Sequence, residues 1–123
     1  MSYLEPGSVE MTASGAKSAT FNSTKEVKTT HAKTVELWID VTATSSGDFT
    51  FNLQTGFDDA VQAADTTADA DWVTVKSKAN VSTVGTHCLL ITRETECMGE
   101  NIRLNCVRNA GTLTFSTRLI VRE

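Results

Sequence analysis

A strict alternation of apolar and polar side chains restricts what this chain can fold into more than any other feature. In TVELWIDVTATS, residues 34–45, Val35, Leu37, Ile39 and Val41 share one parity, and Glu36, Asp40 and Thr42 share the other. A period of two residues is that of a β-strand with one face in a core. This segment is therefore predicted to be a strand.

Similar patterns recur along the chain and predict an all-β fold. Strands are predicted at 34–45, 49–55, 71–78, 87–94, 101–109 and 112–123, with weaker ones at 8–13, 18–23 and 26–30. HCLLITRE, residues 87–94, is apolar on both faces and suggests a central strand. Short Gly, Ser and Asn turns between strands favour an antiparallel β-sandwich, and we expect a jelly roll of about eight strands. An immunoglobulin-like strand order is the alternative.

The first ten residues differ from the rest. MSYLEPGSVE carries the Pro6-Gly7 break, and its exposed apolar side chains are expected to be Tyr3 and Leu4. We predict an N-terminal arm over 1–10 and a single sandwich domain over 11–123. A frayed terminus is the alternative interpretation.

Charge and hydropathy exclude several classes of protein. The formal net charge is -4, whereas nucleic-acid phosphates attract basic surfaces, so no nucleic-acid partner is expected. The start of the chain lacks a basic, apolar signal sequence, and no apolar run approaches the length of a membrane span. We therefore expect no membrane partner and no export by the classical route.

The three cysteines, Cys88, Cys97 and Cys106, form no C-x-x-C pair and are odd in number. A disulfide framework is therefore not expected. Cys106 shares the parity of Ile102 and Leu104, so it is predicted to be a free, buried thiol.

An acidic stretch, GFDDAVQAADTTADADWVTV at 56–75, holds five aspartates and no basic residue. Carboxylates on a loop can bind calcium, and Asp65, Asp69 and Asp71 are the candidate metal ligands. The pattern of an EF-hand is absent, however. The favoured interpretation is a long, solvated connection between two strands, without metal or cofactor.

No catalytic motif is present. His31 and His87 stand in no recognisable arrangement with a nucleophile, and the adjacent Asp58 and Asp59 would face opposite ways in a strand. The chain is not expected to be an enzyme.

Aromatic side chains on the outer faces of strands are the candidate partner-binding residues. Trp38 lies opposite Leu37 and Ile39 in parity, and Trp72 lies opposite Val73 and Val75. Both indoles are therefore predicted to point outward, where tryptophan is typical of interface centres; second-layer core is the alternative. The predicted partner-binding residues are Tyr3, Leu4, Trp38, Trp72 and Ile120.

Four segments together resemble a group of small β-sandwich proteins of tailed bacteriophages. They are ASGAKSATFNS, VELWIDVTATSSGDFTFNLQT, DWVTVKS and NIRLNCVRNAGTLTFSTRLIV, which lie between residues 13 and 122. The family has a short acidic-Gly turn before the tryptophan, where this chain has its long acidic stretch. Ile102-Arg103 is a second departure, because the family has Tyr or Val before the arginine.

This resemblance implies a virion structural protein, most specifically a capsid decoration (cement) protein. Such a protein binds the outer surface of the shell built by the major capsid protein, as a dimer or trimer of itself. A carbohydrate-binding or structural module of a phage tail or fibre is the alternative that the same resemblance allows.

Overall fold

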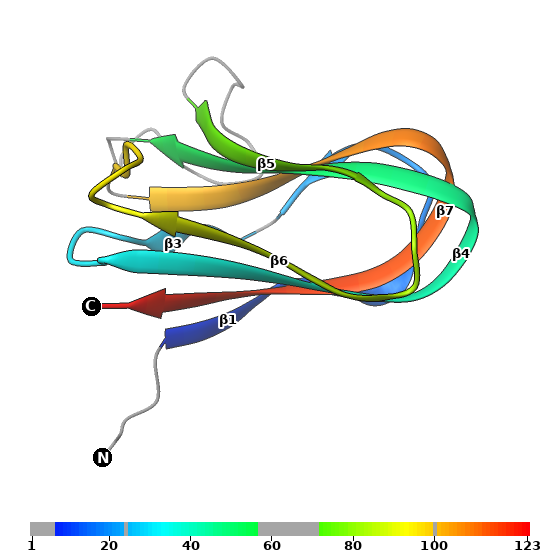
Figure 1. Cartoon of the computed structure of the whole chain (residues 1–123), viewed down its shortest axis with the longest axis horizontal. Coiled ribbons are helices and arrows are strands. Elements are labelled where there is room, and N and C mark those ends of the chain that lie inside the picture. The colour runs from blue at the N-terminus through cyan, green and yellow to red at the C-terminus, as the bar shows by residue number, and fades with distance from the viewer. Residues whose placement is uncertain (1–6, 24, 57–71, 100) are drawn as a thin grey trace.

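The computed structural model describes residues 7–23, 25–56, 72–99 and 101–123 (Figure 1). These residues form strands without helices. The strands are β1 (Gly7–Lys17), β2 (Phe21–Asn22), β3 (Val27–Lys28), β4 (Thr34–Gly56), β5 (Val73–Val81), β6 (Gly85–Thr92) and β7 (Asn101–Arg122).

The two long strands, β4 and β7, pair antiparallel along almost their whole length. Figure 1 shows both strands curving together at one end of the molecule, so that the sheet folds back over itself. Because both strands bend at the same place, each contributes one half to each of two layers. The sandwich is thus a single hydrogen-bonded sheet that packs against itself.

The shorter strands complete the two layers. In the first, called here the β6 layer, the order is β1, the end of β7, the start of β4, and β6. In the second, the β5 layer, β2 and β3 pair with the start of β7, which pairs with the end of β4 and then β5. Both layers are antiparallel, and in the second one β2 and β3 lie along successive parts of the same edge of β7.

Glycine makes the bend possible. Gly111 has a positive φ of 57°, and a Cβ there would lie 2.1 Å from the carbonyl oxygen of Ser46. A Cβ on Gly47 would lie 2.3 Å from the carbonyl oxygen of Thr112. The two backbones therefore approach each other closely because neither residue carries a side chain.

The core lies between the layers and is centred on aromatic rings. The ring centroid of Phe115 lies 5.4 Å from that of Phe49 and 5.0 Å from that of Phe51, both in edge-to-face geometry. Aromatic pairs prefer this arrangement because the positive ring edge meets the negative ring face. Phe21 stacks on the same ring from β2.

The prediction of an all-β antiparallel sandwich is confirmed. The predicted parity is also correct for β4 and β7, where Leu37, Leu53, Leu104 and Leu119 are fully buried. Cys106 is buried as predicted, and all three cysteines are free. Burial raises the pKa of the Cys106 thiol far above its ordinary value, because the thiolate would lose its hydration.

Two sequence predictions about strands are wrong. The predicted arm extended to residue 10, but β1 begins at Gly7 and its residues Ser8, Val9 and Glu10 pair with β7. Val9 packs against the core, which accounts for the ordered pairing so early in the chain. Residues 87–94 were expected to be a central strand, but β6 pairs only with β4 among the described strands, so it is an edge of its layer.

Replacing Gly111 by alanine tests the bend. The added Cβ meets the Ser46 carbonyl and the residue must keep a left-handed conformation, so Gly111→Ala should lower the free energy of unfolding by about 2 kcal/mol or more. Gly15→Ala is the matched control, because its Cβ meets only the flexible end of Lys17. Chemical denaturation measures both; equal stability of the two variants would contradict the role of Gly111.

Candidate functional site

The outer surface of the β6 layer brings together side chains from four strands. Cross-strand pairing places Arg118 beside Trp38 and Trp38 beside Cys88, and the next row runs from Ile120 to Glu36 and Leu90. We call this surface the Trp38 face. It comprises Ser8, Glu10, Glu36, Trp38, Asp40, Thr86, Cys88, Leu90, Ser116, Arg118, Ile120 and Arg122.

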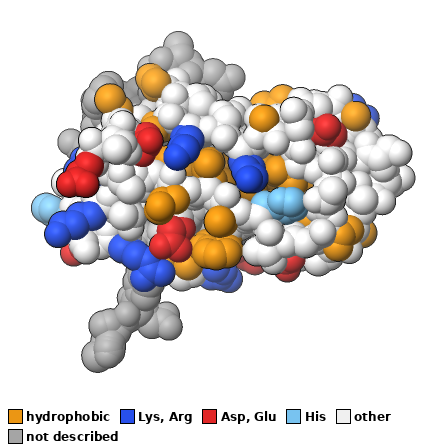
Figure 2. All heavy atoms as spheres, viewed as in Figure 1, with side chains coloured by type: hydrophobic (Ala, Val, Ile, Leu, Met, Phe, Trp, Pro, Cys, Tyr) orange, Lys and Arg blue, Asp and Glu red, His pale blue; other side chains and the backbone are white. Residues whose placement is uncertain are grey.

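The centre of the Trp38 face is apolar. Trp38 is 39% exposed and Leu90 is 47% exposed, which makes them two of the most exposed large hydrophobic residues among those described. Cys88 is exposed between them, and Ile120 is half-buried nearby. Figure 2 shows hydrophobic side chains gathered with acidic and basic ones on the viewed side of the molecule.

Glu36 holds the indole of Trp38 in place. Trp38 Nε1 donates a hydrogen bond to Glu36 Oε1 at 3.0 Å, and Arg122 Nε donates to Glu36 Oε2 at 2.8 Å. These bonds, that from Arg122 above all, hold the pKa of the Glu36 carboxyl below its usual value, because both favour the charged form. The two bonds together hold the exposed indole in one orientation.

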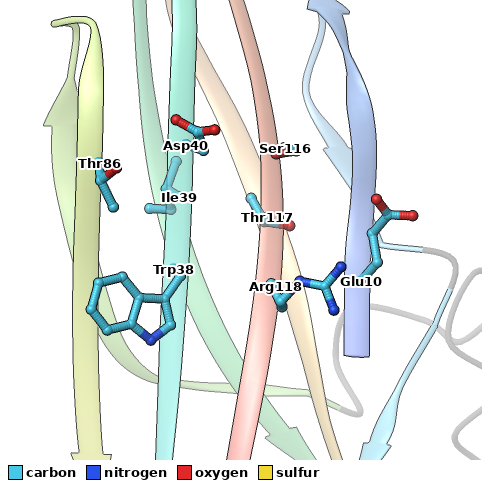
Figure 3. A pocket seen from close by; sticks show the side chains of 8 residues that line it. All are labelled: Glu10, Trp38, Ile39, Asp40, Thr86, Ser116, Thr117 and Arg118. Carbon is cyan, nitrogen blue, oxygen red and sulfur yellow. The ribbon is translucent and has the colours of Figure 1, made fainter. Parts of the chain in front are cut away.

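A shallow groove of about 220 Å³ runs beside the indole (Figure 3). It is lined by Glu10, Trp38, Ile39, Asp40, Thr86, Ser116, Thr117 and Arg118. In Figure 3 the indole extends from β4 toward β6 with its broad face turned to the viewer, and Arg118 points toward Glu10 on β1. Ring face and charged groups are thus presented on one surface.

Several polar side chains of this groove have no partner within the described part of the chain. No hydrogen bond joins the side chains of Glu10, Asp40, Thr86 or Ser116 to other described residues. Arg118 Nη1 donates to the neutral Ser8 Oγ at 2.9 Å, and within the described residues it forms no ion pair. These groups remain available to a ligand or to a partner surface.

Charges on the Trp38 face are sorted by strand. β4 contributes the acids Glu36 and Asp40, whereas the adjacent β7 contributes the bases Arg118 and Arg122. Glu10 adds one further acid on β1. An acidic strand and a basic strand therefore lie side by side across the apolar centre.

The prediction that Trp72 points outward is wrong. Its indole is only 5% exposed, and the guanidinium carbon of Arg103 lies 4.7 Å from the ring centroid. Arg103 is fully buried and donates from Nε to Gln54 Oε1 at 2.7 Å. The indole covers this buried cation and shields it from water. Val73, which was expected to point inward, is 57% exposed, whereas Val75 packs against the core as predicted. The alternation is interrupted here because the pairing of β5 with β4 shifts its register between Leu53 and Gln54.

Other predicted site residues remain without structural evidence. Tyr3 and Leu4, and the aspartates Asp65, Asp69 and Asp71, lie outside the described residues. Within the described ranges no group of three or more His, Cys, Asp or Glu side chains could hold a metal ion. The same residues include no helix of sufficient length and apolarity to cross a membrane.

Within the described residues, neither histidine is hydrogen-bonded to the side chain of a cysteine, serine or threonine. His31 is exposed in the connection after β3, and His87 contacts the carbonyl oxygen of Thr83 at 2.9 Å. Cys88 follows His87 directly in β6, so their side chains lie on opposite sides of the strand. A nucleophile needs a base within hydrogen-bond reach, and this pair does not provide one.

Cys88, Leu90 and the charged residues around Trp38 were not among the predicted site residues. The signal for Cys88 and Leu90 was present in the apolar second face of HCLLITRE, which was attributed to a central strand. One face of β6 packs on the core and the other belongs to the outer surface of its layer, so that second apolar face is exposed.

Comparison with known proteins adds support to the fold. No family model and no curated protein matches the chain. Among solved structures, PirA matches 93% of this chain and 95% of its own with 14% identity and a TM-score of 0.52. Since the identity is low, the likeness to PirA shows a shared fold and nothing further.

Two other solved structures match less well. The SPBc2 prophage-derived protein YomS matches 98% of each chain with 13% identity and a TM-score of 0.48. A chain in the structure of infectious bursal disease virus Gx strain matches with 11% identity and a TM-score of 0.44. That match covers 95% of this chain but only 31% of the viral one.

Acid titration tests the bond between Glu36 and Trp38. The lowered pKa means that the stabilisation by charged Glu36 is complete above the carboxyl's unfolded pKa and is lost as pH falls through the lower folded pKa. In a Trp72→Phe background, Trp38 fluorescence should change with a midpoint below the ordinary pKa of a glutamate carboxyl. Glu36→Gln should remove this transition; a midpoint above the ordinary glutamate value would contradict the assignment.

Proposed function

We propose that this chain is a non-enzymatic virion structural protein, specifically a capsid decoration (cement) protein. It binds the outer surface of the shell built by the major capsid protein of a tailed phage and stabilises that shell. The observation that carries the proposal is the Trp38 face, an exposed apolar centre with a charged rim.

The composition of this face is that of a protein-docking surface. Tryptophan and arginine are the residues most enriched at the energetic centres of interfaces, and a polar rim around them excludes water. Trp38 is already held by Glu36, so binding costs little side-chain entropy. Exposed apolar side chains grouped on one surface of a domain mark an interaction site.

The sequence resemblance to phage β-sandwich proteins supports the virion context, and the sandwich fold agrees with it. The proposed partners are the major capsid protein and further copies of this chain; nucleic acid and membrane are not among them. Tyr3 and Leu4 are proposed as a second contact, in which a short arm binds the capsid and joins neighbouring subunits. The proposed location is the capsid surface, after assembly in the host cytoplasm.

Co-sedimentation with expanded, undecorated capsids of the encoding phage tests this function. Wild-type protein should saturate at a simple ratio to capsid subunits. Trp38→Ala and Leu90→Ser should each weaken binding by about tenfold or more, because each removes part of the apolar centre.

Val73→Ser is the matched control for that experiment, since Val73 is an exposed apolar residue of the β5 layer. Deletion of residues 2–6 tests the arm and leaves β1 complete. Failure of the wild-type protein to bind capsids would refute the decoration role. Wild-type binding by both Trp38 face variants would exclude this face from the contact.

Carbohydrate binding on a tail or fibre is the second candidate function, and the groove of Figure 3 is the observation that favours it. An exposed ring face can stack on the apolar face of a sugar. The carboxylate of Asp40 and the hydroxyls of Thr86 and Ser116 can bond to sugar hydroxyls.

A glycan array followed by titration calorimetry tests this candidate. Trp38→Ala and Asp40→Asn should abolish glycan binding, whereas Leu90→Ser should preserve it because Leu90 does not line the groove. Absence of any glycan signal for the wild-type protein excludes this function.

A further inference from the structure

We propose that the Trp38 face binds the same face of a second copy of this chain, across a two-fold axis parallel to the strands and midway between β4 and β7. This inference rests on the proposed function, whose partners include further copies of the chain. It adds which surface the copies use in solution and how they are related. Because the proposed capsid contact uses the same face, the free dimer and the capsid-bound protein are alternatives, and capsids compete with dimerisation.

The sorting of charges by strand selects the orientation of the axis. A two-fold axis between β4 and β7, parallel to both, places β4 of one copy opposite β7 of the other. Glu36 and Asp40 then face Arg118 and Arg122 of the second copy, and the reverse contact forms at the same time. An axis across the strands would instead place β7 opposite β7 and bring the arginines together.

The same axis accounts for the exposed indole. Trp38 and Arg118 are cross-strand partners in one row, so rotation about the axis brings the indole of one copy opposite the guanidinium of the other. A guanidinium over an indole face is a favourable cation–π contact that strengthens when water is excluded. Figure 3 shows the ring face and Arg118 on the same side of the layer.

The charges of Asp40 and Arg118 also favour a second copy of the chain as the partner. Among the described residues, Asp40 and Arg118 form no ion pair, unlike Glu36 and Arg122, which bind each other. In the proposed dimer Asp40 lies diagonally across from Arg118 of the other copy, so each gains an opposite charge. A partner surface of a single sign would be repelled by one of the two strands.

Sheet packing is compatible with this arrangement. Two sheets that pack face to face keep their strands within about 30° of each other at a spacing of about 10 Å. An axis parallel to the strands produces such an aligned pair. The small side chains at the margins of the face, Ser8, Thr86 and Ser116, leave room for the larger central ones.

Sedimentation velocity over about 5 to about 500 µM of the full chain tests the proposal. Wild-type protein should be a reversible dimer with a dissociation constant in the micromolar range. Arg118→Asp, Asp40→Arg and Trp38→Ala should each raise that constant by about tenfold or more. Lys25→Asp is the control for charge reversal, because Lys25 is exposed in the connection between β2 and β3, away from the face.

The decisive variant carries Arg118→Asp and Asp40→Arg together. In the proposed dimer, residue 40 of each copy lies diagonally across from residue 118 of the other. The double reversal restores opposite charges at these positions, so it should return the dissociation constant to within about threefold of wild type. A wild-type monomer at every concentration overturns the proposal, as does a dimer insensitive to the single variants. If the double variant dimerises as weakly as the single variants, the proposed orientation of the two-fold axis is wrong.

Capsid binding separates this inference from the proposed function. If the decoration role is wrong and the dimer is right, capsid co-sedimentation fails while the dimer persists. If the dimer is wrong and the decoration role is right, the monomer still saturates capsids.

Discussion

The antiparallel pairing of β4 with β7 is the interaction on which the rest of the structure depends. Both strands run through both layers, so neither layer exists without the pair. The close approach of the backbones at Gly47 and Gly111 allows the pair to fold back on itself. Phe49, Phe51 and Phe115 then meet across the fold and form the core.

This pairing also creates the Trp38 face. Leu37 and Ile39 are buried in the core. Since successive side chains of a strand point to opposite faces, Glu36, Trp38 and Asp40 lie on the outer face of β4. The register with β7 then sets Arg118 beside Trp38. The position of Trp38 and the sorting of charges therefore follow from the register between β4 and β7. The edge strand β6 adds Leu90 to the apolar centre.

The strands, their buried residues and the outward position of Trp38 could be predicted from the local alternation of apolar and polar residues. In the interiors of β4 and β7, one face packs on the core, so the period of two residues identified the buried residues and placed Trp38 outside. Alternation does not reveal how many neighbours a strand has, and β6 was therefore taken for a central strand. The inward position of Trp72 was also not predictable from alternation, since its indole contacts the buried Arg103, a residue far away in sequence. The register shift in the pairing of β5 with β4 interrupts the alternation there.

The central claim is that the Trp38 face is covered when the protein acts, and differential alkylation of its cysteines tests this most directly. Cys88 lies on the face, exposed Cys97 lies outside it, and buried Cys106 reports unfolding. In concentrated or capsid-bound protein, mass spectrometry should find that Cys88 is protected relative to dilute protein, whereas Cys97 reacts equally in both. Equal alkylation of Cys88 in the free and associated states would contradict the account.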